Sequence, residues 1–340
     1  MGKKSKNEPS IREIAAAADV STATVSRVLN RHPHVSAEVR ERVLSAARAR
    51  GYAPTIASSS NLFGILLGSR EDMTVSPYFN QVLRSLSHTL FLAGYDVQIF
   101  SRAQFPYILR NTFRGVAVFS ESDGRFFQER QIPCVVVNNP FPEGYSVVTD
   151  HAEGLKIAVD HLLKLGHRKI AYLHSDPTQW GSRSRLEGYK RALLAAGLAF
   201  EERLHRDYSA DKDFENHLRS LLASSPTALI VEGENAGLPA DHALKKLGVR
   251  IPEELSLITF ESTACSQFLY PEHTTVCQDF ASLGRCAAET LLLLALSPEK
   301  AATVPRIQIL HNDLICRASC RALAEEELCP PPLPRNGEVS

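Results

Sequence analysis

Two different patterns of apolar positions divide this chain of 340 residues. Between residues 10 and 54, apolar side chains recur at helical spacing in three short runs, which predicts three helices. The ends of these runs carry residues that cap or break helices: Ser10 with Glu13 three positions on, Asp19, Ser21, Ser36 and Gly51. The second helix is expected from Thr22 to Asn30, with Val25 and Val28 on its buried face.

From Leu62 onward, short continuous apolar runs alternate with segments of helical periodicity. Strands are expected at LFGILLG, YDVQIF, GVAVFS, PCVVVNN, RKIAYLH, TALIVE, LSLITF and RIQIL, and helices at residues 77–93, 152–165, 184–196, 240–247 and 283–296. Strands that are apolar on both faces and separated by helices belong to parallel sheets covered on both sides. The fold class we predict is α/β: an all-α three-helix headpiece followed by two doubly wound parallel-sheet lobes.

The first two predicted helices are joined by a tight turn and closed by a third, which is the helix-turn-helix plan. In that plan the second helix enters the major groove of DNA. Its outward residues are small hydroxyls, one methyl group and one guanidinium: Thr22, Ala23, Thr24, Ser26 and Arg27. Arginine suits guanine edges, methyl groups suit thymine, and hydroxyls reach phosphates. The alternative is a small helical packing module whose polar face is only solvated.

Charge is distributed unevenly along a chain that is neutral in total. Residues 1–61 hold 10 Lys/Arg against 5 Asp/Glu, a net charge of +5, which leaves 28 against 33, or −5, for the remainder. A basic segment suits phosphate groups, whereas an acidic body does not adhere to DNA. The distribution of charge therefore favours the DNA-binding interpretation over the packing module.

The stretches VSTATVSRVLN and HVSAEVRERVLSAARARGYAP strongly resemble the DNA-binding headpiece of the LacI/GalR family of bacterial transcriptional regulators. The resemblance is nearly continuous from Ser10 to Pro54. It implies that Thr22, Ala23 and Arg27 occupy base-reading positions and that His34, in the following loop, also reaches DNA. The DNA contacts we expect are Ser21, Thr22, Ala23, Thr24, Ser26, Arg27, Asn30 and His34.

The segment after Pro54, TIASSSN, departs from the family pattern. In the family this segment is longer, forms a hinge helix on operator DNA and inserts a leucine into the minor groove. Here the linker is short and the Ala-Arg-x-Leu pattern is absent, although Ile56 or Leu62 is apolar enough to substitute. Two interpretations stay open, a plain flexible tether and a short hinge helix.

The rest of the chain resembles the family's periplasmic-binding-protein-like effector domain over nearly its whole length. Matching segments include DHAEGLKIAVDHLLKLGHRKIAYL, RSRLEGYKRALLAAGL, LGVRIPEELSLITFE and TTVCQDFASLGRCAAETLLL. The resemblance implies three crossings between the lobes, near Asp150, Gln278 and His311. The first lobe is trimmed, because only FPYILRNT stands where the family has a full helix. The domains we expect are a headpiece at 1–54, a linker at 55–61, one lobe at 62–149 plus 279–310, a second at 150–278 plus 311–323, and a disordered tail at 324–340.

Ligands in such folds bind between the lobes, at the carboxyl ends of the strands. The resemblance places an aromatic platform, a bidentate donor and a hydroxyl acceptor there: Tyr78, Phe79, Trp180, Arg185, Tyr208 and Glu261. Trp180 is expected in the loop before the helix at 184–196. Each residue has a structural alternative, with the aromatic side chains as core or as cover for a lobe edge, Arg185 as the partner of Glu187 or of a neighbouring loop, and Glu261 as a solvated rim residue.

Enzymes are the main alternative class of protein. The sequence contains no Gly-rich phosphate loop, nucleophile elbow or cluster of metal ligands, so no catalytic residue, metal or cofactor is expected. The pairs Asp211/Asp213 and Glu232/Glu234 are interpreted as carboxylates of solvated loops or of a pocket rim, and not as a catalytic dyad. Seven scattered cysteines, of which only Cys316 and Cys320 are close in sequence, indicate free thiols rather than a zinc site.

No apolar run reaches the length of a membrane span, and the polar start MGKKSKNEP has no signal-peptide core. A cytoplasmic protein is therefore expected, which also argues against a secreted solute-binding protein. The hypothesis is a homodimeric, sequence-specific transcriptional regulator, in the first instance a repressor, that binds double-stranded operator DNA and a small sugar-like effector. The alternatives are a two-lobed sugar-modifying enzyme and a regulator controlled by a protein partner.

Overall fold

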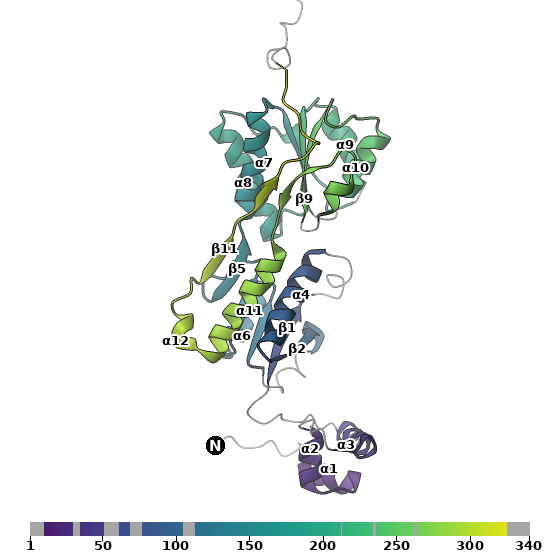
Figure 1. Ribbon diagram of the computed structural model, residues 1–340, viewed down its shortest axis with the longest axis vertical. Coiled ribbons are helices and arrows are strands. Elements are labelled where there is room, and N and C mark those ends of the chain that lie inside the picture. Colours follow the sequence, from purple (N-terminus) through teal and green to yellow (C-terminus); the bar gives the residue numbers. More distant parts are fainter. Residues whose placement is uncertain are drawn as a thin grey trace, which may run out of the picture.

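The structure, a computed structural model, describes residues 10–29, 35–50, 61–68, 77–104, 113–211, 213–233, 236–261 and 264–324. Three short helices form a headpiece, and a larger body contains two six-stranded sheets with their helices. The two sheets follow one another along the long axis, with the headpiece at one end (Figure 1). The predicted α/β fold with a three-helix headpiece is confirmed. No helix within the described ranges is both long and apolar enough to cross a membrane.

The headpiece consists of α1 (Ile11–Ala18), α2 (Thr22–Leu29) and α3 (Ala37–Ala49). α1 begins with the predicted capping box, in which the Ser10 hydroxyl accepts the Glu13 N–H and the Glu13 carboxylate accepts the Ser10 N–H at 2.7 Å. Asp19 then ends the helix in the left-handed conformation, at φ 49°. Apolar residues of all three helices form one small core: Ile14, Ala15, Ala18, Val25, Val28, Val43 and Ala47.

The first lobe is built on an all-parallel sheet with the strand order β2-β1-β3-β4-β5-β11. Its strands are β1 (Leu62–Leu67), β2 (Asp96–Ser101), β3 (Gly115–Val118), β4 (Cys134–Val137), β5 (Tyr145–Thr149) and β11 (Ile307–Leu310). Its helices are α4 (Pro77–Leu92), α6 (Glu121–Gln128), α11 (Phe280–Leu296) and α12 (Pro298–Ala301), with a short 3-10 turn η2 (Arg102–Gln104) after β2. α4 and α11 pack against each other and the sheet. Gly284 permits this approach, because a Cβ there would lie 2.5 Å from the Val82 carbonyl oxygen.

The second lobe has the strand order β7-β6-β8-β9-β10-β12, and only β12 runs antiparallel to its neighbour. Its strands are β6 (Ile170–His174), β7 (His205–Asp207), β8 (Ala228–Val231), β9 (Ser256–Glu261), β10 (Thr274–Cys277) and β12 (Asp313–Ile315). One apolar core lies under α7 (His151–Lys164) and α8 (Trp180–Ala195), and a second under α9 (Phe214–Leu222) and α10 (Gly237–Lys246). Two 3-10 turns, η3 (Glu202–Leu204) and η4 (Ala264–Phe268), complete the lobe.

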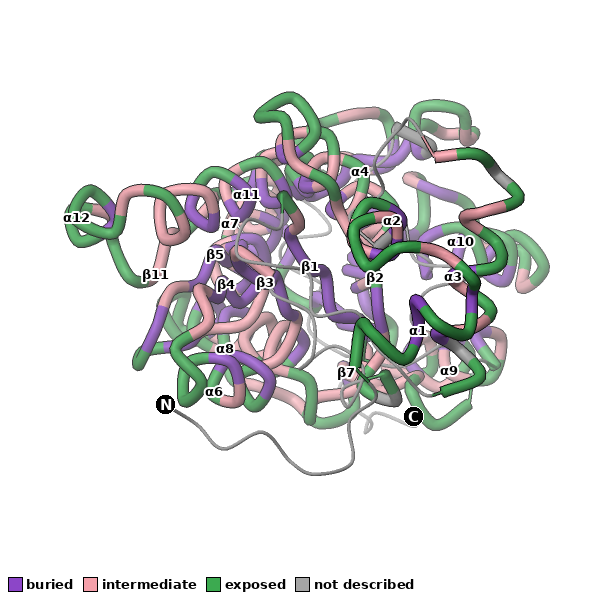
Figure 2. The backbone as a smooth tube through the Cα atoms, turned by 90° about the horizontal axis from the view of Figure 1, so that it is seen from below, coloured by how far each residue is buried: buried purple, intermediate pink, exposed green. Residues whose placement is uncertain are grey.

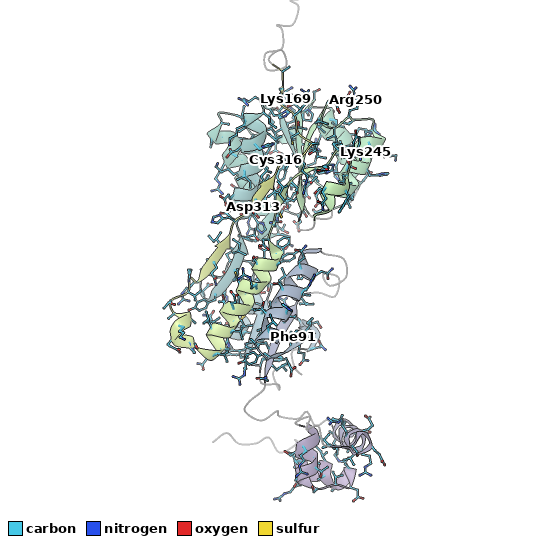
Figure 3. The ribbon with its side chains drawn as sticks, viewed as in Figure 1. Phe91, Lys169, Lys245, Arg250, Asp313 and Cys316 are labelled. Atoms are coloured by element: carbon cyan, nitrogen blue, oxygen red, sulfur yellow. The ribbon has the colours of Figure 1, made fainter. Side chains whose placement is uncertain are left out.

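The chain passes between the two sheets three times, from β5 into α7, from β10 into α11 and from β11 into β12. Figure 3 labels Asp313 at the last of these passages, between the two lobes. The strands are mostly buried and the helices are mostly exposed on their outer faces, as Figure 2 shows. Because each of the three passages leaves the carboxyl end of a strand in one sheet and enters the other lobe, the carboxyl ends of both sheets face each other at the crossings.

Seven helices and strands were not predicted from the sequence: α6, α9, α12, β5, β7, β10 and β12. β7, with the sequence HRD, has no apolar residue and is held by backbone pairing with β6, which a pattern of side chains does not reveal. The linker at 55–60, the trimmed segment at 105–112, the rim residues Glu234 and Asn235 and the tail from 325 lie outside the described residues. Both interpretations of the linker therefore stay open.

Candidate functional site

The exposed face of α2 is the first candidate site. Val25 and Val28 are buried in the headpiece core, and the same helix exposes Thr22, Ala23 and Arg27 on its other side. α2 has no acidic residue in its first turn, so no carboxylate offsets the positive end of its dipole there. A small polar face of this kind, next to a positive helix terminus, suits the phosphates and base edges of a DNA groove.

Ser21 and Thr24 stabilise the start of α2. The Ser21 hydroxyl accepts the Thr24 N–H at 3.0 Å and lies 2.9 Å from the Thr24 hydroxyl. This is the arrangement of an N-cap residue. Ser26 is half-buried, and the predicted contacts Asn30 and His34 lie outside the described residues. A role of any of these residues in contacting DNA stays a prediction.

Arg185 in the second lobe is the centre of the second candidate site. Its Nη1 lies 3.0 Å from the Oε1 of Glu232, and its Nη2 donates to the Oε1 of Gln278 at 3.2 Å. The side chains of Arg185 and Glu232 are only 12% and 1% exposed. Arg185 thus pairs with Glu232 and not with Glu187, and the two charges depend on each other because neither is solvated.

Glu232 is fully buried directly after β8, so its interpretation as a carboxylate of a solvated loop was wrong. Its carboxylate also accepts the hydroxyl of Tyr172, and its backbone carbonyl accepts the hydroxyl of Tyr208 at 2.9 Å. Burial and then the charge of Glu232 raise the pKa of Tyr172 well above its ordinary value and that of Tyr208 to about 12. Both phenols therefore keep their protons and act as donors.

The hydrogen bonds continue from Gln278 to the first crossing. The Nε2 of Gln278 lies 3.2 Å from the Nδ1 of His151, and the His151 ring meets the ring of Trp180 at a centroid distance of 5.0 Å. Burial and then the charge of Arg185 lower the pKa of His151 well below its ordinary value, so the ring is neutral and its Nδ1 accepts the Gln278 amide proton. We call the whole set the Arg185 network: His151, Tyr172, Trp180, Arg185, Tyr208, Glu232 and Gln278.

Four aromatic rings gather at the carboxyl edge of the first sheet: Tyr78, Phe79, Phe119 and Phe280. The ring of Tyr78 lies 4.9 Å from that of Phe79, 6.4 Å from that of Phe119 and 4.8 Å from that of Phe280, measured between centroids. Tyr78 and Phe79 are half-buried and pack against the core of the lobe. This aromatic cluster is thus continuous with the core and partly accessible. Tyr78 and Phe79 are therefore compatible both with a role in the core and with a role as a platform for a ligand.

Both groups of residues lie where the strand order of a sheet reverses. β1 lies between β2 and β3, and Phe119 comes just after β3; β6 lies between β7 and β8, and Glu232 comes just after β8. In doubly wound sheets, ligands bind outside the carboxyl ends of the strands at this reversal. Gln278 of the network and Phe280 of the cluster are two residues apart in one crossing. We call the Arg185 network and the aromatic cluster together the interlobe site.

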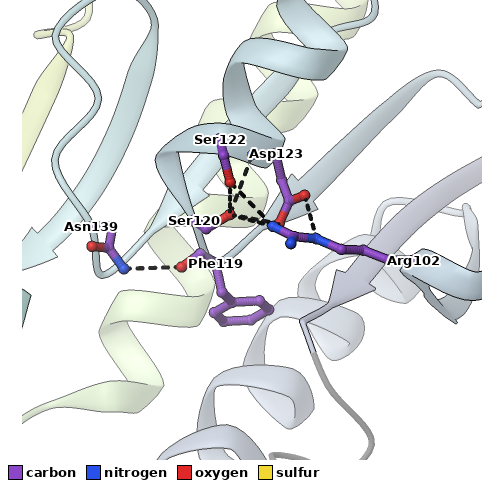
Figure 4. Close-up of polar contacts among 6 residues, drawn as sticks. All are labelled: Arg102, Phe119, Ser120, Ser122, Asp123 and Asn139. Carbon is purple, nitrogen blue, oxygen red and sulfur yellow. Dashed lines mark hydrogen bonds and ion pairs between the residues drawn. The ribbon is translucent and has the colours of Figure 1, made fainter. Parts of the chain in front are cut away.

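A second ion pair, between the half-exposed Arg102 and the buried Asp123, lies beside the aromatic cluster. Arg102, which follows β2, donates from Nε and Nη2 to the two carboxylate oxygens of Asp123, both at 2.8 Å (Figure 4). Ser120 completes the group, since its hydroxyl donates to Asp123 at 2.6 Å and caps α6. The hydrogen bond with Asp123 raises the pKa of Arg102. This pair fixes the start of α6 against the end of β2.

The structure brings together only part of the predicted effector site. Trp180 is the first residue of α8 rather than a loop residue, since the helix begins at Trp180 and not at Ser184 as expected. Trp180, Arg185 and Tyr208 belong to one network, whereas Tyr78 and Phe79 belong to the cluster of the other lobe. The backbone of Glu261 ends β9 beside Cys277, and its side chain lies outside the described atoms. Sequence reasoning did not connect His151, Glu232 or Gln278 with Arg185, because these partners lie far apart in the chain.

Comparisons with known families recognise both parts of the chain. Residues 10–55 match the family described as bacterial regulatory proteins, lacI family, and residues 159–320 match a periplasmic binding protein-like domain. The probable HTH-type transcriptional repressor ExuR of Bacillus subtilis (strain 168) is 26% identical over 338 residues, which cover 92% of this chain and 98% of the relative. The HTH-type transcriptional repressor CytR of Escherichia coli (strain K12) is 28% identical over 351 residues, with coverage of 94% and 99%.

Solved structures with the same fold cover nearly the whole chain. A complex of the transcriptional regulator CelR with cellobiose has a TM-score of 0.68 and 24% identity, with 92% of this chain and 100% of that chain covered. A lac repressor dimer bound to operator and the anti-inducer ONPF also has a TM-score of 0.68 and 24% identity, with coverage of 93% and 100%. These similarities extend the shared fold from the headpiece to both lobes.

Proposed function

Because the chain belongs to the LacI family of bacterial regulatory proteins, we propose that it is a transcriptional repressor whose affinity for operator DNA is set by a small molecule at the interlobe site. The observation that carries this proposal is the exposed face of α2, with Thr22, Ala23 and Arg27, on a basic headpiece joined to an acidic body. Arg27 would contact a guanine edge, the methyl groups of Thr22 and Ala23 would contact thymine, and the other basic residues would contact phosphates.

The active form we propose is a homodimer, in which two headpieces read two half-sites of a near-palindrome. Large apolar side chains are exposed in both lobes, and exposed apolar side chains that form one contiguous patch mark an interaction surface. The first lobe exposes Phe91, Leu92 and Ile99, which are 55%, 77% and 44% accessible. The second exposes Leu238, Phe268 and Tyr270, which are 53%, 82% and 90% accessible. α4 and β2 of one lobe and α10 of the other lie on the same side of the long axis in Figure 1, so one partner can cover them together.

The effector would bind between the carboxyl edges of the two sheets, in contact with Arg185 and with the aromatic cluster. Gln278 and His151 belong both to the Arg185 network and to two of the crossings between lobes. A ligand that alters these contacts would therefore favour one arrangement of the lobes over another. Regulation needs no turnover of the ligand, and we place the protein in the cytoplasm, where its DNA target lies.

Selection of binding sites from random duplex DNA tests the proposal. The full-length protein is expected to enrich a two-fold symmetric sequence, because a symmetric dimer reads two equivalent half-sites. A chain that begins at residue 61 is the matched control, and it should enrich nothing while still forming a dimer. Failure of the full-length protein to enrich any sequence would contradict the proposed function.

A further inference from the structure

Among the described residues, one guanidinium group at the carboxyl edge of each sheet is paired with a carboxylate of the same chain. Arg185 is bound to Glu232 in the second lobe, and Arg102 is bound to Asp123 in the first. The side chains of these two carboxylates are buried, at 1% and 6% exposure. Each pair is neutral in total, so neither Arg185 nor Arg102 offers an unbalanced positive charge to an anion.

An acidic ligand would be repelled at Arg185. A carboxylate or phosphate placed beside this guanidinium would also lie close to Glu232, so that one positive charge would face two negative charges. Like charges at such short range repel strongly where water is excluded. His151 offers no compensation, because burial and the nearby Arg185 lower its pKa and keep the ring neutral.

A ligand without charge meets no such penalty and finds a donor. The Nε of Arg185 is buried and makes no hydrogen bond with the described residues. An unsatisfied buried donor of this kind is stabilised by any acceptor that reaches it, and a hydroxyl group is an acceptor. On the other side of the interlobe site, Tyr78 and Phe79 are half-buried and offer ring surface to the C–H faces of a sugar.

We propose that Glu232 sets the charge selectivity of the interlobe site, so that the effector is an uncharged sugar or other polyhydroxy compound and not a sugar acid or sugar phosphate. Glu232 acts through Arg185 as a positioning residue, since it occupies the guanidinium edge that would otherwise bind an anion. This inference rests on the proposed function and narrows its effector to one chemical class.

Matched pairs of compounds test this selectivity directly. The full-length protein is titrated with D-glucose and D-glucuronate, D-galactose and D-galacturonate, and D-ribose and D-ribose 5-phosphate. Binding is followed by the rise in melting temperature and by the fluorescence of Trp180, the one tryptophan of the chain. Glu232→Gln removes the charge but keeps an acceptor for Tyr172 and Arg185. Glu187→Gln is the control, because it makes the same change at an exposed position of the same helix as Arg185.

The neutral member of at least one pair is expected to bind wild type and the control about tenfold or more tightly than its acidic partner. In Glu232→Gln the ratio of the two affinities should shift in favour of the acid by about tenfold or more, since the positive charge of Arg185 is then no longer neutralised by Glu232. The inference is overturned if the acid binds wild type as tightly as the neutral compound, or if Glu232→Gln weakens both members equally. Should this variant not fold, the ratio for wild type alone decides.

A complete absence of binding by wild type would contradict both this inference and the effector part of the proposed function. The selection of DNA sites without ligand then decides whether the DNA-binding part stands. An acidic preference in wild type, by contrast, would overturn the charge selectivity while leaving a small-molecule repressor in place. The two failures therefore give different results.

Discussion

The exposed face of α2 and the interlobe site contain similar polar side chains in different surroundings, solvated on α2 and buried between the sheets. On α2, Thr22 and Arg27 are exposed to water. Between the sheets, Tyr172 and Arg185 bind the buried Glu232. A surface that meets DNA can leave its polar groups solvated, because the phosphates supply the opposite charge on binding. A buried site must satisfy its charges before any ligand arrives, and this requirement also selects which ligand fits.

The largest expected effect in either region is the loss of stability on removal of the buried Glu232 carboxylate. Glu232→Ala leaves the charge of Arg185 buried and unpaired, which is expected to lower the free energy of unfolding by about 3–5 kcal/mol. Urea unfolding of the full-length protein measures this loss. Glu187→Ala on the exposed face of α8 is the control and should change the same quantity by less than about 0.5 kcal/mol. Equal small losses in both variants would show that the buried pair is not a structural requirement.

Substitutions on the exposed face of α2 should change the affinity for DNA and not the stability of the protein. Arg27→Ala is expected to weaken binding to the selected operator by about 1–3 kcal/mol and to relax the base preference at one position of each half-site. Arg42→Ala, at an exposed basic position of α3, should weaken binding to all sequences alike. Anisotropy titrations against the operator and its single-base variants separate these effects. An unchanged base preference in Arg27→Ala would mean that α2 does not read the DNA.

The start of the headpiece depends on one local contact. Ser10→Ala removes the hydroxyl that caps α1 and is expected to destabilise the headpiece by about 1 kcal/mol. Hydrogen exchange of the α1 amides in the full-length protein reports this change. Ser45→Ala, in the exposed middle of α3, is the matched control and should leave α1 unchanged. Equal protection of the α1 amides in wild type and Ser10→Ala would argue against a role for the capping box.

The exposed pair of His311 and Glu153, at one of the crossings between the lobes, should contribute least to stability, and only at low pH. The Nδ1 of His311 lies 2.6 Å from the Oε2 of Glu153, and this hydrogen bond raises the pKa of His311 above its ordinary value of 6.5. A pKa raised by folding stabilises the folded state fully below the unfolded value, and the gain is lost as the pH rises through the folded value. The melting temperature of wild type should therefore exceed that of His311→Asn below pH 6.5, and the difference should fade only as the pH rises above 6.5 through the raised pKa of His311. A difference that grows with pH would contradict this sign.

Local signals made the headpiece predictable from the sequence. The capping box of Ser10 and Glu13 and the left-handed turn at Asp19 depend on residues within a few positions of each other, and the structure contains both. Most of the parallel strands were equally readable as short runs of mostly apolar residues, whereas β5, β7 and β10 were not predicted. α6 and α9 were missed because their sequences, ESDGRFFQ and FENHLRSLL, are short and rich in polar residues. β7 was missed because its neighbour in the sheet, and not its side chains, makes it a strand.

The interlobe site was predictable only in part, because its partners are distant in the chain. The resemblance to the LacI/GalR family pointed to Arg185, yet Glu232 lies 47 positions and Gln278 93 positions further along. Nothing near Glu232 distinguishes a carboxylate that ends a strand in water from one that meets a buried arginine. The fold decides between these two states by bringing α8 over the carboxyl end of β8. The charge of the site is therefore a property of the tertiary structure.

Operator affinity measured with and without ligand tests most directly whether these two regions work together. The full-length protein is titrated onto its selected operator in the absence of ligand and at a saturating concentration of the neutral sugar that stabilises it most. We predict that the sugar changes the affinity by about tenfold or more, a coupling free energy typical of allosteric proteins. An operator affinity that stays the same while the sugar is bound would contradict the account, because the interlobe site would then have no influence on α2.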